Sequence, residues 1–123
     1  MNVKIQERGW GGHFILASRC RFRRNTLLTY GDTRIVVSTV GLLASQDDSK
    51  FETIGLNRYF ETMAFYANNE DTRYYDADVQ KEVPIDGEWC ISEIDADDRA
   101  NDMHEAAVRE ISVKLMNHSL KQE

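Results

Sequence analysis

The fold is decided by one stretch of the chain, TLLTYGDTRIVVSTV at residues 26–40. Both arms of this stretch are rich in β-branched and aromatic side chains, which favour strands. Between the arms, Gly31 and Asp32 form a turn signal, so the pattern predicts a β-hairpin. Working outward from the hairpin, further strands are predicted over residues 13–23, 51–55, 58–67, 72–83 and 88–91.

The C-terminal part of the chain has a different period. Apolar side chains recur there at helical spacing, at Ala100, Met103, Ala107, Ile111 and Leu115. This stripe predicts one long helix that ends near residue 117, with Asp95 or Asp97 as its N-cap and His104 at the margin of the stripe. Strands come first and one helix last. The predicted fold class is therefore α+β, with an N-terminal antiparallel sheet of hairpins and one main C-terminal helix packed on it.

Length and composition predict one domain over residues 1–123, with an extended lead-in at 1–12 and a disordered tail at 118–123. No apolar run approaches the roughly 20 residues that a membrane-spanning helix needs, and residues 1–8 lack the apolar segment of a signal peptide. We therefore expect a cytoplasmic protein with no membrane partner. The lead-in ends in Gly9-Trp10-Gly11-Gly12, which predicts a tight turn or a loop that lies against a ligand.

A basic cluster interrupts this acidic chain, whose formal net charge is −6. Its four arginines fall within six positions, at Arg19, Arg21, Arg23 and Arg24. Alternation in a strand puts the first three on one face, and Arg24 on the other face with Cys20 and Phe22. The chain is expected to leave the strand at Arg24, Asn25 and Thr26, whose donors would point into a pocket.

The guanidinium group is a planar fork that suits phosphate oxygens, so the basic cluster indicates an anion site. A solvated strand face that blunts a sheet edge would explain the same arginines, and both interpretations stay open. Residues 1–34 hold seven basic and two acidic side chains, and the rest of the chain is strongly acidic. Because an acidic body repels duplex nucleic acid, we expect a small anion rather than a duplex as the partner.

Signatures of catalysis are mostly missing from the sequence. It has no phosphate-binding glycine loop, nucleophile elbow or dinucleotide fingerprint, and its three histidines lack the spacing of zinc ligands. Asp76 and Asp78 share a predicted strand face and would be the metal ligands of a phosphodiesterase, although a solvated strand face explains them as well. We therefore expect a non-catalytic protein without a cofactor or metal.

Aromatic side chains exceed what one small helix-on-sheet core needs. They are Trp10, Tyr59, Phe60, Phe65, Tyr66, Tyr74, Tyr75 and Trp89. Such rings can stack on a nucleobase or can bury an interface between copies of the chain. The predicted strand at 58–67 is apolar on both faces, so one face would meet the helix and a partner chain could cover the other.

Segments 9–14, 23–28, 34–41, 52–55 and 100–105 together resemble the first Thoeris anti-defence family of phage and prophage proteins. Members of that family are sponges that bind the cyclic ADP-ribose-type signal of bacterial TIR enzymes and hold it without cleaving it. Some members also take up cyclic oligonucleotides. The resemblance implies an antiparallel sheet with a C-terminal helix, assembly into dimers or higher oligomers, and action in the host cell cytoplasm.

The resemblance also implies ligand-binding residues. A pocket made of a ring, an asparagine and a helix arginine would use Trp89, Asn101 and Arg109. A second, phosphate-rich site would use Arg21, Arg23, Arg24, Asn25 and Thr26. The expected function is sequestration of a cyclic nucleotide immune signal. Three alternatives remain open: a protein-binding phage inhibitor or structural subunit without a small ligand, a metal-dependent phosphodiesterase, and a single-strand nucleic-acid binder.

Overall fold

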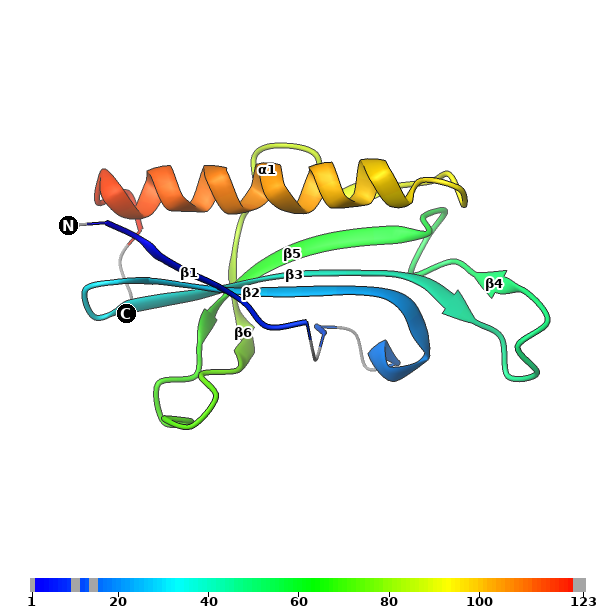
Figure 1. Ribbon diagram of the computed structural model, residues 1–123, viewed down its shortest axis with the longest axis horizontal. Helices are drawn as coiled ribbons and strands as arrows, with labels where there is room; N and C mark the ends of the chain where they lie inside the picture. The colour runs from blue at the N-terminus through cyan, green and yellow to red at the C-terminus, as the bar shows by residue number, and fades with distance from the viewer. Residues whose placement is uncertain (1, 10–11, 14–15, 121–123) are drawn as a thin grey trace.

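The computed structural model describes residues 2–9, 12–13 and 16–120. Within these residues, seven strands form one antiparallel sheet and a single long helix packs on one face of it (Figure 1). The predicted α+β class is therefore confirmed. The elements are β1 (Lys4–Glu7), η1 (Ala17–Arg19, a 3-10 turn), β2 (Cys20–Tyr30), β3 (Thr33–Ala44), β4 (Phe51–Glu52), β5 (Phe60–Ala67), β6 (Ala77–Val83), β7 (Cys90–Ile91) and α1 (Asp97–Met116).

Neighbouring strands follow the order β1-β2-β3-β5-β6, with β4 paired to β3 and β7 paired to β5. The predicted hairpin is β2 and β3, which pair from Tyr30 opposite Thr33 to Cys20 opposite Leu43. The turn between them contains Gly31 at a φ of 61°, a backbone conformation that glycine adopts without strain. The prediction of two strands over 13–23 and 26–30 is wrong, because β2 continues unbroken along its partner β3.

Helix α1 covers one face of the sheet with the predicted stripe. Ala100, Met103, Ala107, Ile111 and Leu115 are all buried there. The predicted N-cap is wrong, because Ala96 occupies that position and no side chain caps the helix. Asp97 and Asp98 instead occupy the first turn, where the positive end of the helix dipole stabilises carboxylates.

The opposite face of the sheet is covered by the chain itself (Figure 1). Ala17 and Cys20 pack against Val40 at one end, and Tyr75 and Ala77 pack against Leu27 at the other. On β5, Phe65 and Ala67 are 3% and 2% exposed, so these two side chains of the face are buried within the chain itself.

Near the C-terminal end of β3, the side chains stop alternating regularly between the two faces of the sheet. Leu42 has a φ of 54° and packs with Phe60 and Met103 under the helix, whereas Val40 packs with Cys20 on the other face. Strict alternation would put Val40 and Leu42 on one face, and the left-handed backbone at Leu42 breaks that alternation. Cys20 and Phe22, predicted to share a face, accordingly belong to different clusters.

Candidate functional site

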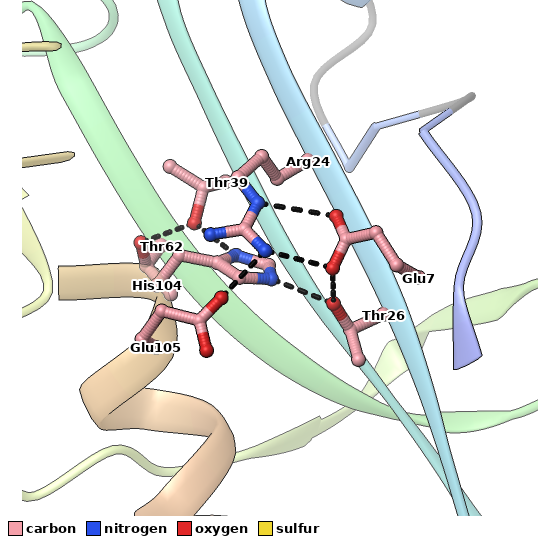
Figure 2. Close-up of polar contacts among 7 residues, drawn as sticks. All are labelled: Glu7, Arg24, Thr26, Thr39, Thr62, His104 and Glu105. Carbon is pink, nitrogen blue, oxygen red and sulfur yellow. Dashed lines mark hydrogen bonds and ion pairs between the residues drawn. The ribbon is translucent and has the colours of Figure 1, made fainter. Parts of the chain in front are cut away.

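The cluster around Arg24 ties three elements together (Figure 2). Nη2 of Arg24 lies 2.8 Å from Oε2 of Glu7 on β1 and 2.6 Å from Oε1 of Glu105 on α1. Burial alone would lower the pKa of Arg24, but its bonds to the two carboxylates outweigh that effect and raise the pKa. Arg24 is therefore neutralised inside the protein, and it fastens β1 and α1 to β2.

Beneath this ion cluster lies a fully buried histidine, His104 (Figure 2). Its Nε2 lies 2.8 Å from Oγ1 of Thr26 and its Nδ1 lies 2.7 Å from Oγ1 of Thr39, which in turn lies 2.6 Å from Oγ1 of Thr62. Burial lowers the pKa of His104 to about 4, so the imidazole is neutral at pH 7. The sequence placed His104 at the margin of the apolar stripe, but it lies at the centre of a polar network.

The positions predicted for three site residues are thus corrected. Arg24, Asn25 and Thr26 were expected at a strand end, where their donors would reach a pocket, but they lie in the middle of β2. Thr26 donates its hydroxyl hydrogen to Glu7 and meets His104, and it is 1% exposed. Asn25 points to the opposite face, is also 1% exposed, and accepts a 2.9 Å hydrogen bond from Nε of Arg8. All three side chains are used to hold the fold.

A second polar cluster lies on the face away from the helix. Nε2 of His13 lies 2.7 Å from Glu61, and Nδ1 of His13 lies 3.0 Å from Oγ of Ser38. Arg58 donates to the other carboxylate oxygen of Glu61 at 2.7 Å. The connectivity of Ser38, His13 and Glu61 matches that of a serine–histidine–acid relay, but Ser38 is 1% exposed. A nucleophile must meet its substrate, so we assign this cluster a structural role and call it the clasp: it holds His13 against Ser38 on β3 and Glu61 on β5.

The remaining arginines of the basic cluster surround a hollow of about 470 Å³. Its lining includes Ser18, Arg19, Arg21, Arg23, Ala44 and Asp48. The lining residues belong to η1, to the start of β2, to the end of β3 and to the turn that follows it. Figure 1 shows that these segments lie at one end of the sheet.

The guanidiniums of the hollow differ from that of Arg24. Nη2 of Arg19 donates to the carbonyl oxygen of Ala44 at 2.5 Å, and Arg21 lies over the ring of Phe51 at 5.5 Å from its centroid. Among the described residues, no carboxylate lies within ion-pair distance of Arg19, Arg21 or Arg23. Three arginines and one acidic residue, Asp48, therefore line the same open hollow, and Arg21, Arg23 and Asp48 are exposed to solvent there.

The other predicted ligand-binding residues lie elsewhere. Trp89 is 43% exposed and stacks near Arg58, whose guanidinium carbon is 5.0 Å from the ring centroid. These two residues line a separate cavity of about 340 Å³. Asn101 and Arg109 are exposed on α1 and line neither cavity. The structure therefore does not bring Trp89, Asn101 and Arg109 into one site with the basic cluster.

Asp76 and Asp78, which the sequence offered as metal ligands, accept hydrogen bonds from nearby backbone N–H groups. Asp76 accepts the backbone N–H of Ala77, and Asp78 accepts that of Gln80. Over the described part of the chain, no three His, Cys, Asp or Glu side chains gather as a metal site would require. The prediction of a ligand-facing loop at Trp10 and Gly11 lies outside the described residues.

Comparison with protein-family models, with curated proteins and with solved structures gives no significant match for this chain. The only helix longer than a single turn in the described residues, α1, is too polar to cross a membrane.

Proposed function

We propose that this protein binds a cyclic nucleotide signal and holds it without converting it, with the hollow beside Arg19, Arg21 and Arg23 as the phosphate-binding site. One observation carries the proposal: three guanidiniums that form no ion pair with a described carboxylate line one hollow of about 470 Å³. This volume is in the range of small-molecule sites. Phosphate oxygens would supply the counter-charges that these guanidiniums lack.

The charge distribution of the whole chain supports a small anionic ligand. The formal net charge is −6, whereas the hollow holds an excess of two positive charges, three guanidiniums against one carboxylate. An acidic body repels an anion from most of the surface, so a local cationic site focuses a small ligand and disfavours a long polyanion. A duplex would have to lie along the acidic surface as well.

None of the three histidines of the chain lines the hollow. His104 lies in the buried network under α1, and His13 lies in the clasp with Glu61 on the other face. Within the hollow, Asp48 is the one titratable acid among the lining residues besides the thiol of Cys20. Cleavage by general acid and base needs a matched pair at the phosphate, whereas holding a ligand needs only complementary charge and shape.

The ligand class of the proposal comes from the resemblance to the first Thoeris anti-defence family. On that basis the ligand is a cyclic ADP-ribose isomer, with cyclic oligonucleotides as a second class, and the protein acts against host defence. Assembly into a homo-oligomer belongs to the same proposal. Apolar side chains on the outer surface of α1 support it, since Val113 is 54% exposed and Met116 is 45% exposed. Native mass spectrometry measures the assembly.

Retention of the ligand tests the proposal. The protein is incubated with cyclic ADP-ribose isomers and cyclic dinucleotides, separated from free ligand, and then heated. We expect the bound compound to be released chemically intact, as measured by mass spectrometry. Recovery of a linear or hydrolysed product would show an enzyme instead. Absence of any bound nucleotide would favour a protein-binding inhibitor or a structural subunit.

A further inference from the structure

Among the residues that line the hollow, Asp48 is the one that carries a carboxylate, beside the three arginines. No ion pair joins Asp48 to an arginine of the described chain. Its position is set instead by the turn that joins β3 to β4. Asp48 donates its backbone N–H to the carbonyl oxygen of Ser45 at 3.0 Å, and Ser45 donates its own N–H to Lys50 at 2.9 Å.

Asp47, the neighbouring residue, braces this turn from inside. Its Oδ1 accepts the hydroxyl of Ser45 at 2.8 Å, the hydroxyl of Ser49 at 2.6 Å and the backbone N–H of Ser49 at 3.0 Å. Hydrogen bonds from Ser49 and Ser45 lower the pKa of Asp47 to about 2, so the brace persists at neutral pH. The turn thus holds Asp48 at the rim of the hollow while the carboxylate of Asp47 is occupied.

A carboxylate in a phosphate site has a chemical consequence. An ionised carboxylate only accepts hydrogen bonds, and it repels a bare phosphate. A ligand gains from Asp48 only if it offers hydroxyl donors beside its phosphates. A free hydroxyl on a sugar ring, such as a ribose 2′-hydroxyl, meets that requirement, because it can donate to the carboxylate. The combination of three guanidiniums and one carboxylate therefore fits a phosphorylated sugar better than it fits a simple anion.

We infer that Asp48 accepts hydrogen bonds from the ribose hydroxyls of the ligand, so that the hollow selects ribonucleotides over their 2′-deoxy counterparts and over inorganic phosphate. This inference rests on the proposed function, because it assigns a role within the same site.

The test compares two probes on the intact protein by titration calorimetry: cyclic di-AMP and its bis-2′-deoxy analogue. Hydrogen bonds to a charged group change affinity by about tenfold or more, so we expect wild type to prefer the ribose form by about that factor. Asp48→Asn should weaken the preference, because its amide oxygen is a neutral and therefore weaker acceptor than a carboxylate, and Asp48→Gly, which has no side-chain acceptor, should abolish it. Both variants should leave the affinity for the deoxy analogue equal or higher, because a repulsive charge is removed. Asp102→Asn, an exposed carboxylate on α1, is the matched control and should keep the preference.

The variant is compatible with the fold. Asp48 has a φ of 60°, a conformation that asparagine and glycine tolerate, so Asp48→Gly provides a second variant. Equal binding of both probes by wild type, or a preference that survives in both Asp48 variants, would overturn the inference and leave the proposed function standing. Binding of neither cyclic dinucleotide nor any cyclic ADP-ribose isomer would overturn the proposed function and the inference with it.

Discussion

The tautomer of His104 follows from its neighbours. The hydroxyl of Thr26 donates to Glu7, so Thr26 must accept from Nε2–H of His104. Nδ1 of the neutral ring is then an acceptor for the hydroxyl of Thr39, which in turn accepts from Thr62. The hydrogen bonds thus run in one direction from Thr62 to Glu7 (Figure 2).

We predict that nitrogen-15 spectra at neutral pH show His104 as the neutral ring with its hydrogen on Nε2. A hydrogen on Nδ1, or a charged ring at pH 7, would contradict the direction assigned to these hydrogen bonds. His118, which is exposed, serves as the reference histidine in the same spectrum.

Burial of His104 also makes stability depend on pH. Its pKa is lowered from 6.5 to about 4, so the stabilising effect of the neutral ring is complete above about pH 6.5 and is lost as the pH falls toward 4. The folded protein should lose about 2 kcal/mol of unfolding free energy between about pH 7.5 and about pH 5. Burial raises the pKa values of Glu7 and Glu61, but the bond from Arg24 lowers that of Glu7, and the bonds with His13 and then Arg58 lower that of Glu61, so these carboxylates stay ionised in that interval.

Urea denaturation at the two pH values measures this loss. His104→Gln should be less stable than wild type at neutral pH but should show little change between the two values, and His118→Gln should behave as wild type. The same pH dependence in His104→Gln as in wild type would show that another group is responsible.

At the scale of single residues, the sequence could not reveal the role of His104. Its partners Thr26 and Thr39 are 78 and 65 residues away, and no linear spacing relates them. His13 and Glu61, which are 48 residues apart, were missed for the same reason. These side chains become partners only in the folded chain, because the pairing of neighbouring strands brings residues that are far apart in the sequence onto one face of the sheet.

Among the elements, β1 depends on Arg24. This edge strand has four residues, all exposed, and its last residue Glu7 receives two hydrogen bonds from Arg24. We predict that Arg24→Ala leaves the fold intact but lowers the unfolding free energy by about 1 kcal/mol, since half-exposed ion pairs contribute modestly and the two carboxylates are left without a cation.

Hydrogen exchange should speed up in β1 of Arg24→Ala, because β1 keeps its backbone pairing with β2 but loses the side-chain bonds from Arg24 that link its last residue to β2 and α1. Arg21→Ala on the same strand is the control and should leave exchange in β1 unchanged. If exchange in β1 is the same in both variants, Arg24 does not fasten the strand.

The hairpin and the helix could be predicted because their signals are local: β-branched arms around Gly31 and a helical stripe ending at Leu115. The division of β2 was wrong because Arg24, Asn25 and Thr26 look like a strand end. In the folded chain they continue β2, since β3 pairs with them, Glu7 accepts hydrogen bonds from Arg24 and Thr26, and Asn25 accepts one from Arg8. Pairing with a central strand outweighed the local polarity.

Across the whole molecule, a band of polar side chains crosses the middle of the sheet on both faces. Under the helix, His104 and Thr39 separate the cluster around Leu28 from the cluster around Phe60. On the other face, the clasp at His13 separates the apolar cluster around Val40 from the apolar cluster around Leu27. Buried polar groups are tolerated only when they are paired, so this band holds its residues in the fold. Arg19, Arg21 and Arg23 lie at the end of the sheet, outside the band.

This arrangement decides which arginines are available to a ligand. Titration calorimetry with cyclic ADP-ribose isomers and cyclic dinucleotides measures most directly how much each arginine contributes to ligand affinity. The account predicts that Arg23→Ala weakens binding of the phosphate ligand by at least about tenfold, while Arg24→Ala and Arg109→Ala stay within about threefold of wild type. Wild-type affinity in Arg23→Ala, together with loss of binding in Arg24→Ala or Arg109→Ala, would contradict the account.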